Sequence, residues 1–231
     1  MLKASLAFLT LAAVAAAPAH ALGKRKDAAA EAAAPADSAT LGTYAPVNYD
    51  LAQDRENILV LDLSNGQRVQ IRLMPQWAPE HVARVKVLAQ QGFYNNVVFH
   101  RVIDGFMAQT GDPTGTGQGG SELPDLKAEF NPQPHLRGTV SMARAASDDS
   151  ANSQFFIVFY PRFSLDKKYT VFGRVIDNMA AVDAIQRGEP PANPTRIVQA
   201  SLASENKPVP AVTQPATPGI TADDLNRPIG N

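Results

Sequence analysis

The sequence predicts a mainly β domain, a closed eight-stranded antiparallel barrel with two α-helices. Short apolar runs with alternating polar positions recur along residues 50–204, and turn pairs such as Asn65-Gly66 and Asp104-Gly105 separate them. Only two stretches instead repeat apolar residues at helical spacing. About eight short strands with two helices suit a closed barrel whose interior is filled by side chains.

Each predicted element follows from a local pattern. The asparagine-glycine pair between the first two runs predicts a β-hairpin. One helix is expected to begin at Pro79, which suits a first turn, and to end at Gly92. A second helix is expected to be capped by Asp177 and to end at Gly188. Strands are expected on either side of residues 104–105 and at residues 58–64, 67–73, 138–144, 153–159, 171–176 and 195–201.

The most informative stretch is residues 97–109, which combines a long cation with aromatic, thioether and amide side chains. Alternation along a strand puts Phe99 and Arg101 on one face, and it puts Met107 and Gln109 on one face of the next strand. A guanidinium beside an apolar surface is unusual and points to a functional site. The alternative is an edge-strand arginine whose stem packs on the surface while its head stays in water.

The strand expected at residues 153–159 has one face for the core and one face that is free for a site. Alternation places Gln154 and Phe156 together on the second face. The core face carries three large apolar side chains, those of Phe155, Ile157 and Phe159.

Residues 1–21 have the pattern of a secretory signal peptide. Lys3 precedes an apolar run over residues 6–17, and Ala19-His20-Ala21 has the small-x-small pattern of a cleavage site. Cleavage after Ala21 predicts an exported, periplasmic protein with no stable membrane insertion; an uncut N-terminal anchor is the alternative. The sequence contains no cysteine, so its fold cannot rely on disulfides in an oxidising compartment.

Two segments of biased composition flank the predicted domain. Residues 22–49 are rich in alanine with mixed charges and no apolar period, which predicts a disordered linker. Residues 205–231 are rich in proline and are predicted to be a disordered tail. Residues 50–204 between them have the length of one domain. A domain of this length buries roughly 70% of the surface that its unfolded chain exposes.

Composition and motif spacing argue against nucleic-acid, metal and nucleotide ligands. The formal net charge is -1 and the sequence pI is about 6.4, without the basic character of a nucleic-acid-binding domain. The histidines are scattered, so no metal site is predicted. His81 is expected to be solvated, and His100 is expected to be a hydrogen-bonded core group on the face opposite Arg101.

Residues 115–120 match the pattern G-x-G-x-x-G. A dinucleotide site needs a helix directly after this pattern, and the prolines between residues 121 and 134 argue against one. The glycines instead indicate a loop whose backbone comes close to a ligand or to another strand. No cofactor is expected.

Six blocks of sequence stand in a fixed order within residues 55–203. They are Phe99-His100-Arg101-Val102-Ile103, Gly105-Phe106-Met107-Ala108-Gln109, Gly111-Asp112, Gly138-Thr139-Val140-Ser141-Met142-Ala143, Ser153-Gln154-Phe155-Phe156-Ile157 and Val171-Phe172-Gly173. Together they resemble the signature of the cyclophilin-type peptidyl-prolyl cis-trans isomerases. The resemblance implies an eight-stranded barrel capped by two helices, with a proline-binding groove on its outer surface.

The resemblance also implies roles for individual residues. Arg101 matches the catalytic arginine, and Gln109 matches an amide that helps to hold both the substrate and Arg101. The expected catalytic residues are Arg101, Phe106 and Gln109. The walls of the proline pocket match Phe106, Met107, Phe156 and Leu165. The groove for the residues before proline matches Ala143, Arg144, Ala145 and Gln154.

Two further positions lie near the rim of the implied pocket. Tyr169 falls where many family members carry histidine, and Phe163 stands beside Ser164, which aligns with the family's tryptophan position. Both Phe163 and Tyr169 are expected to contact the substrate. The serine implies weak binding of cyclosporin-like macrocycles.

The resulting expectation is a monomeric, exported prolyl isomerase that assists the folding of envelope proteins. Its expected partners are proline-containing polypeptides and unfolded exported proteins. Intact Arg101, Phe106 and Gln109 favour an enzyme. The alternative is a noncatalytic proline-peptide-binding or chaperone module that uses the same groove. Such a module would need no arginine, so the presence of Arg101 argues for the enzyme.

Overall fold

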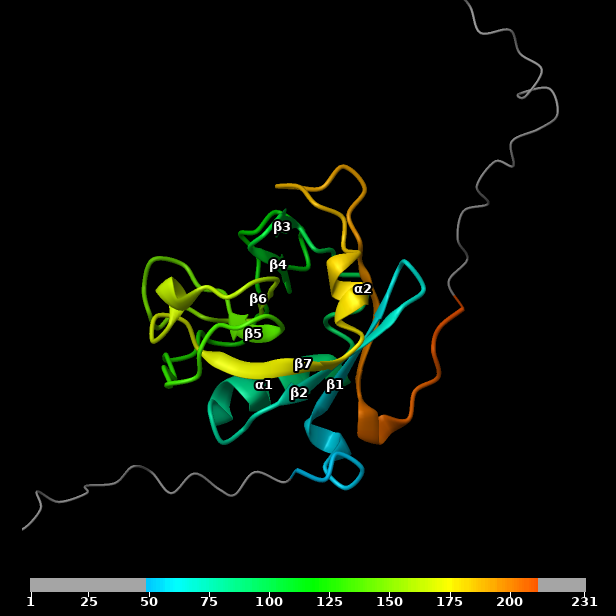
Figure 1. The fold of residues 1–231 in the computed structure, drawn as a ribbon, viewed down its shortest axis with the longest axis horizontal. Helices are drawn as coiled ribbons and strands as arrows, with labels where there is room; N and C mark the ends of the chain where they lie inside the picture. The colour runs from blue at the N-terminus through cyan, green and yellow to red at the C-terminus, as the bar shows by residue number, and fades with distance from the viewer. Residues whose placement is uncertain (1–48, 212–231) are drawn as a thin grey trace, which may run out of the picture. The chain divides into compact units, whose positions relative to one another are not determined.

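The computed structural model describes residues 49–211, which form one sheet with two α-helices and three short 3-10 helices (Figure 1). The predicted signal peptide, the predicted linker up to residue 48 and residues 212–231 lie outside the described residues. No described helix is long and apolar enough to cross a membrane, and no group of potential metal ligands gathers within residues 49–211. The strands are β1 (Ile58–Leu63), β2 (Arg68–Leu73), β3 (Arg101–Ile103), β4 (Met107–Thr110), β5 (Thr139–Met142), β6 (Phe155–Val158), β7 (Val171–Asp177) and β8 (Ile197–Leu202).

The sheet is antiparallel, with the strand order β3-β4-β6-β5-β7-β2-β1-β8. It curls into an open half-barrel rather than the predicted closed barrel, because no continuous ladder joins its edge strands β3 and β8. The chain before β3 reaches the chain beside β8 through an isolated bridge between Val98 and Arg196. Asn96 has a positive φ of 63°, which lies outside the extended region, so this segment does not continue the ladder.

Alternation along β6 separates the main core from an outer apolar cluster. Phe155 and Ile157 are buried in the main core, whereas Phe156 belongs to the outer cluster, as alternation predicted. The same reasoning failed for Phe99 and Arg101. Phe99 is completely buried in the main core, and Arg101 is only partly buried on the outer side. Because β3 begins at Arg101, alternation does not extend back to Phe99.

Helix α1 (Pro79–Gln90) begins at the predicted proline and ends before Gly92, which has a φ of 73°. Its N-cap residue offers no side-chain acceptor. The Glu129 carboxylate instead accepts hydrogen bonds from the backbone N–H groups of Glu80 and His81, at 3.2 and 3.1 Å. It also contacts His81 Nδ1 at 2.6 Å. His81 is fully buried, so the prediction of a solvated imidazole is wrong.

Helix α2 (Met179–Asp183) is shorter than predicted and begins one residue later. Asp177 remains in the ladder with β2, so it is not available as a cap. Asn178 takes that role: it has a φ of 57°, and its side-chain oxygen accepts a hydrogen bond from Ala181 N–H at 3.2 Å. In the view of Figure 1, α1 and α2 lie on opposite sides of β7.

The folded region continues past the predicted boundary at residue 204. Glu205 lies in a 3-10 helix and accepts a hydrogen bond from the end of β8 at 2.7 Å. Arg68 and Gln199 donate to the carbonyl oxygens of Lys207 and Pro208, respectively, each at 3.1 Å. Residues 205–208 therefore pack on the sheet, where composition alone predicted a disordered tail.

Candidate active site

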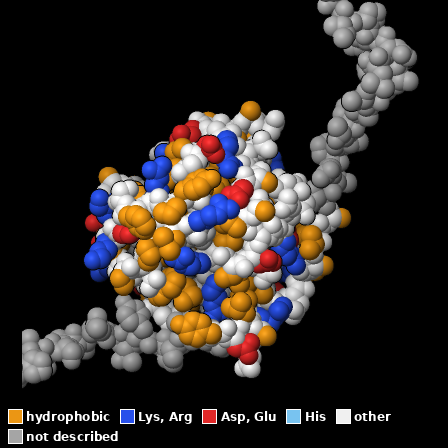
Figure 2. Space-filling model, viewed as in Figure 1, with side chains coloured by type: hydrophobic (Ala, Val, Ile, Leu, Met, Phe, Trp, Pro, Cys, Tyr) orange, Lys and Arg blue, Asp and Glu red, His pale blue; other side chains and the backbone are white. Residues whose placement is uncertain are grey.

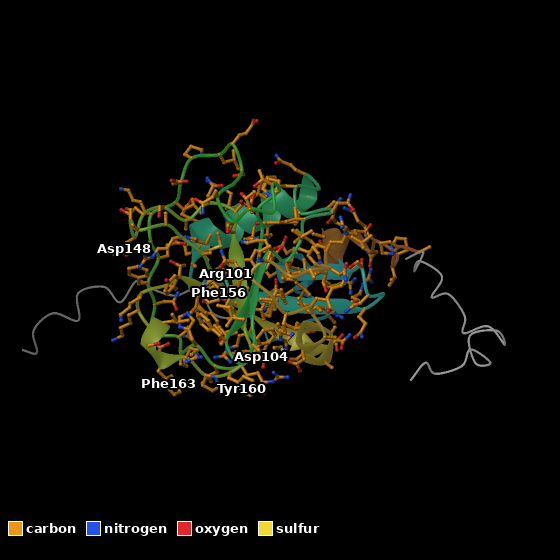
Figure 3. All side chains as sticks on the ribbon, turned by 90° about the horizontal axis from the view of Figure 1, so that it is seen from above. Arg101, Asp104, Asp148, Phe156, Tyr160 and Phe163 are labelled. Carbon is orange, nitrogen blue, oxygen red and sulfur yellow. The ribbon has the colours of Figure 1, made fainter. Side chains whose placement is uncertain are left out.

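A cavity of about 660 Å³ opens beside β3, β4 and β6. Figure 3 shows Arg101 and Phe156, both of which line it, close together near the centre of the domain. The predicted site residues that line this cavity are Arg101, Phe106, Met107, Gln109, Ala143, Arg144, Phe156, Leu165 and Tyr169. Most of the predicted site is therefore brought together in one place.

Apolar side chains from separate elements form one wall of this cavity. Met107 on β4 and Phe156 on β6 are buried, and Phe106, Leu165 and Tyr169 pack against them. The rings of Phe156 and Tyr169 meet edge to face, with centroids 5.6 Å apart. The four residues that the resemblance assigned to a proline pocket lie together in this wall, which suits a compact apolar ring.

Arg101 enters the same cavity from the start of β3. Its Nε donates a hydrogen bond to Glu189 Oε2 at 2.8 Å, and no described residue accepts one from its terminal Nη groups. Gln109 pairs with Arg101 across the ladder, but its amide donates to Gln154 Oε1 at 2.9 Å. The expectation that Gln109 holds Arg101 is therefore wrong, because no hydrogen bond joins these two side chains and Glu189 holds the guanidinium.

Arginine side chains lie over aromatic rings at the edge of the cavity. The guanidinium carbon of Arg144 is 4.9 Å from the Tyr169 ring centroid, and that of Arg162 is 5.1 Å from the Phe106 ring centroid. Arg144 also pairs with Asp148 at 2.9 Å. On the face of the molecule shown in Figure 2, Lys and Arg side chains likewise lie among apolar side chains. Such contacts hold the cations beside the rings.

A second cavity of about 450 Å³ lies beside the glycine-rich loop. Ala145 and Gln154 line it. Five residues border both cavities: Gln109, Gly117, Gln118, Ala143 and Arg144. The Gln154 amide donates to the carbonyl oxygens of Gly117 and Gly119 at 3.1 and 2.8 Å, which ties the loop to the start of β6. The residues predicted to form an extended groove therefore lie together in this neighbouring hollow.

Asp112 organises the glycine-rich loop. Its buried carboxylate accepts hydrogen bonds from the Thr114 hydroxyl at 2.8 Å and from the N–H groups of Thr114, Gly117 and Gly119 at 2.7, 2.6 and 3.1 Å. Burial raises the pKa of Asp112, but these hydrogen bonds outweigh burial and lower the pKa to about 2. A Cβ at Gly119 would collide with this carboxylate. The glycines therefore serve a loop packed on Asp112, which agrees with the predicted close backbone approach.

His100 lines the same cavity as Arg101 and is buried. Neither ring nitrogen has a hydrogen-bond partner among the described residues; the Gln154 amide lies nearby without hydrogen-bond geometry. The prediction of a hydrogen-bonded core imidazole facing away from Arg101 is therefore wrong. Burial lowers the pKa of His100, and the Asp112 carboxylate opposes that shift only in part. His100 is thus a neutral part of the cavity at pH 7.

A buried hydrogen-bonded network supports the apolar wall from behind. His135 Nε2 pairs with the Ser141 hydroxyl at 2.9 Å, and Nδ1 pairs with Asp166 Oδ1 at 2.8 Å. The His135 ring stacks on Phe156, with centroids 6.3 Å apart and an interplanar angle of 14°. These residue types also make up nucleophilic triads. Ser141 is fully buried and lines neither cavity, however, so the network serves to hold Phe156 in place.

Lowering the pH from about 7.5 to 5.5 is expected to reduce the free energy of unfolding. Burial lowers the pKa of His81, His100 and His135 in the folded state. The unfolded chain, whose histidines have an ordinary pKa near 6.5, therefore takes up protons first as the pH falls. The contribution of these three histidines to the free energy of unfolding is therefore fully present above about pH 7 and is lost progressively below it. Urea unfolding at pH 7.5, 6.5 and 5.5 measures this slope.

His100→Gln provides the control for this pH dependence, because it removes one titrating ring that makes no hydrogen bond. The variant should show a shallower loss of stability between pH 7.5 and 5.5. Equal free energies of unfolding at the two pH values in the unmodified protein would contradict the prediction.

Phe163 is the predicted site residue that lies outside both cavities. It begins the 3-10 helix η2 (Phe163–Leu165), and it is 63% exposed. Figure 3 shows it at the margin of the domain, apart from Arg101 and Phe156. Successive residues of a 3-10 turn point roughly 120° apart, so Leu165 can line the cavity while Phe163 faces solvent. The assignment of Phe163 to the substrate site is therefore not supported.

The cavity of Arg101 also contains residues that the sequence did not single out, notably Glu189 and Pro190. Glu189 lies 88 positions from Arg101 along the chain, and no local pattern links residues so far apart. The signal in the sequence is Gly188-Glu189-Pro190-Pro191, where glycine and proline mark a turn. That signal predicts that the chain changes direction there, but it does not predict which residue Glu189 contacts.

Solved structures similar to this one define its class of fold. The crystal structure of cyclophilin AquaCyp293 from Hirschia baltica matches with a TM-score of 0.61 and 26% identity, covering 71% of this chain and 84% of that chain. A cyclophilin type peptidyl-prolyl cis-trans isomerase from Cryptosporidium parvum, crystallised in the presence of the dipeptide Ala-Pro, matches with a TM-score of 0.58 and 28% identity. That match covers 63% of this chain and 98% of the other. The half-barrel is therefore cyclophilin-like.

Sequence comparison leads to the same family. Residues 58–202 match the family described as cyclophilin type peptidyl-prolyl cis-trans isomerase/CLD. A probable peptidyl-prolyl cis-trans isomerase of Brucella suis is 45% identical over 172 residues, which cover 68% of this chain and 87% of the relative. Peptidyl-prolyl cis-trans isomerase B of Bacillus subtilis is 41% identical over 128 residues, covering 55% and 89%. The chain belongs to the cyclophilin-type peptidyl-prolyl cis-trans isomerases, which confirms the predicted class of enzyme.

Proposed function

We propose that the domain accelerates rotation about X-Pro bonds in exported polypeptides, with Arg101 as hydrogen-bond donor and the apolar wall as the grip on the proline ring. One observation carries this proposal: the free Nη groups of Arg101 and the wall that contains Phe156 line the same cavity. The reaction requires neither a proton transfer nor a covalent intermediate.

The role of Arg101 follows from the electronic structure of the amide. Resonance makes the C–N bond partly double, so rotation faces a barrier of roughly 20 kcal/mol. In the twisted amide the prolyl nitrogen regains a lone pair, to which a fixed guanidinium N–H can donate. The planar amide offers no such acceptor. The hydrogen bond is therefore made mainly in the transition state, which is the condition for raising kcat.

The apolar wall has a complementary role. Phe106, Met107, Phe156 and Leu165 would enclose the proline ring and hold it while the preceding carbonyl rotates. Enclosure also removes water that would otherwise stabilise the polar, planar ground state. Because the ring is held in both the ground state and the transition state, the wall contributes to affinity as well as to rate.

The proposed substrates are proline-containing segments of unfolded exported proteins. The presence of Ala-Pro in the Cryptosporidium parvum crystals supports binding of proline peptides. The second cavity would hold the residues before proline, with Ala143 and Arg144 at its entrance. The signal-like residues 1–21 support a periplasmic location. The protein is further proposed to work as a monomer without a cofactor.

Two measurements test this proposal. Residues 22–231 are expected to accelerate cis-to-trans conversion of a short X-Pro peptide in a protease-coupled assay. Peptide binding without acceleration would instead support the noncatalytic binding module.

Mass spectrometry of the protein from a periplasmic fraction should find Leu22 at the N-terminus. A membrane-bound species that retains Met1 would contradict export by a cleaved signal.

A further inference from the structure

The segment that follows α2 is held against β3 by a reciprocal pair of backbone hydrogen bonds. Gly188 N–H donates to the Val102 carbonyl at 2.9 Å, and Val102 N–H donates to the Gly188 carbonyl at 2.8 Å. In an antiparallel pairing, the next residues on the two segments stand opposite each other. Glu189 therefore stands across from Arg101.

Glycine is required where this segment meets β3. Gly188 has a φ of 143°, and a Cβ there would lie 2.5 Å from Pro191 Cα. A side chain at this position would thus collide with the backbone of Pro190 and Pro191 and distort the turn that carries Glu189. The local sequence is built to bring residue 189 close to Arg101.

Arg187 anchors the same segment one residue earlier. Its Nε donates to Asp104 Oδ1 at 3.1 Å, its Nη1 donates to the Asp183 carbonyl at 2.8 Å, and its guanidinium lies 4.2 Å from the Phe159 ring centroid. The backbone that carries Glu189 is therefore fixed by contacts that do not involve Arg101.

Glu189 contacts Arg101 through one nitrogen and leaves the rest of the guanidinium free. Its Oε2 is 2.8 Å from Arg101 Nε, and the Arg101 and Glu189 side chains are 43% and 51% exposed. Among the described residues that line the 660 Å³ cavity, Glu189 is the only acidic one. No other described side chain hydrogen-bonds to Arg101.

We infer that Glu189 is a positioning residue: it fixes the plane of the Arg101 guanidinium through Nε and so directs the two Nη groups into the cavity. The inference rests on the proposed function, in which an Nη–H donates to the prolyl nitrogen. Because guanidinium is rigid and planar, fixing Nε restricts where both Nη groups point. The carboxylate makes a charge-assisted hydrogen bond, which is stronger than one to a neutral acceptor.

Isomerisation kinetics of the Glu189 variants test this role. Glu189→Ala is expected to lower kcat/KM by about tenfold, because a misaimed donor stabilises the twisted amide less well. The loss should fall in kcat, with the peptide Kd within about twofold, because the donor acts mainly in the transition state. The thermal midpoint should stay within about 2 °C, since an exposed ion pair contributes little to folding. Glu189→Gln should recover most of the rate, because its amide oxygen still accepts from Nε.

Asp183→Asn is the matched control, because it weakens an exposed ion pair, to Arg137, that contacts neither Arg101 nor Glu189. It also keeps the Asp183 backbone carbonyl that accepts from Arg187. Its kcat/KM should match that of the unmodified protein. The proton-nitrogen NMR resonance of Arg101 Nε–H should move in Glu189→Ala and stay in place in Asp183→Asn. An unmoved resonance in Glu189→Ala would overturn the inference.

A double variant shows whether Glu189 acts through Arg101. In the Arg101→Ala background, Glu189→Ala should cause no further loss. A tenfold loss in that background, or an unchanged or higher rate in Glu189→Ala alone, would overturn the positioning role. An unchanged rate in Arg101→Ala alone would instead refute the proposed function.

Discussion

Replacing Arg101 by alanine is expected to lower kcat/KM by about 10² to 10³, comparable to removing a preorganised donor from an oxyanion hole. The affinity for a proline-containing peptide should change by less than about threefold, because the planar amide does not accept this hydrogen bond. Titration of a peptide while cis-trans exchange is followed by NMR measures both quantities on the same samples. Equal losses of affinity and rate would reduce Arg101 to a binding residue and leave catalysis to the apolar wall.

Two further variants separate the geometry of Arg101 from its charge. Arg101→Lys keeps the charge but lacks the planar fork, so it should recover little of the rate. Arg137→Ala is a matched control, because Arg137 is also 43% exposed, is paired with one carboxylate and lines neither of the two cavities described. Its kcat/KM should be nearly that of the unmodified protein. A comparable loss in Arg137→Ala would point to a general electrostatic effect.

The pH dependence of kcat distinguishes this mechanism from general base catalysis. Arginine stays protonated throughout the range of the assay, and burial lowers the pKa of the neighbouring His100. The rate should therefore be nearly constant between pH 7 and 8. A rise of tenfold over that unit would require a titrating base, which the proposed mechanism does not contain.

The parts of the fold that the sequence predicted well depend on local patterns. The hairpin of β1 and β2 surrounds Gly66, whose φ of 80° explains why the asparagine-glycine pair is a reliable signal. The alternation that predicted Phe155 in the core and Phe156 in the site also depends on consecutive residues alone and not on a neighbouring strand. Such signals are carried by a few consecutive residues.

The parts that the sequence did not predict depend on residues far apart in the chain. Glu129 buries His81 and caps α1 from 48 positions away, and Glu189 rather than Gln109 engages Arg101. Gln109 was a reasonable partner by resemblance, since it faces Arg101 across the ladder. The Gln109 amide nitrogen donates to Gln154 instead. Which of these side chains pair is decided by their three-dimensional geometry, which the periodicity of the sequence does not reveal.

Replacing Phe156 by alanine is expected to weaken peptide binding and rate together, in contrast to Arg101→Ala. The Phe156 ring is 5% exposed and is held between His135 and Tyr169. Its removal opens the wall that grips proline in the ground state and the transition state alike. We expect kcat/KM to fall by about 10² and the peptide Kd to rise by at least tenfold, consistent with the loss of about 2 to 3 kcal/mol of apolar contact.

The same truncation should cost about 3 kcal/mol of unfolding free energy, because a buried ring is lost from the outer cluster. Urea unfolding therefore has to accompany the NMR titration, so that only folded protein is counted. Phe156→Leu keeps an apolar side chain in the wall and should recover a large part of both binding and stability. Phe163→Ala is the matched control, since Phe163 is 63% exposed and lies outside both cavities. A rate loss in Phe156→Ala with an unchanged Kd would contradict a ground-state grip by the wall. Weaker peptide binding by Phe163→Ala would return Phe163 to the substrate site.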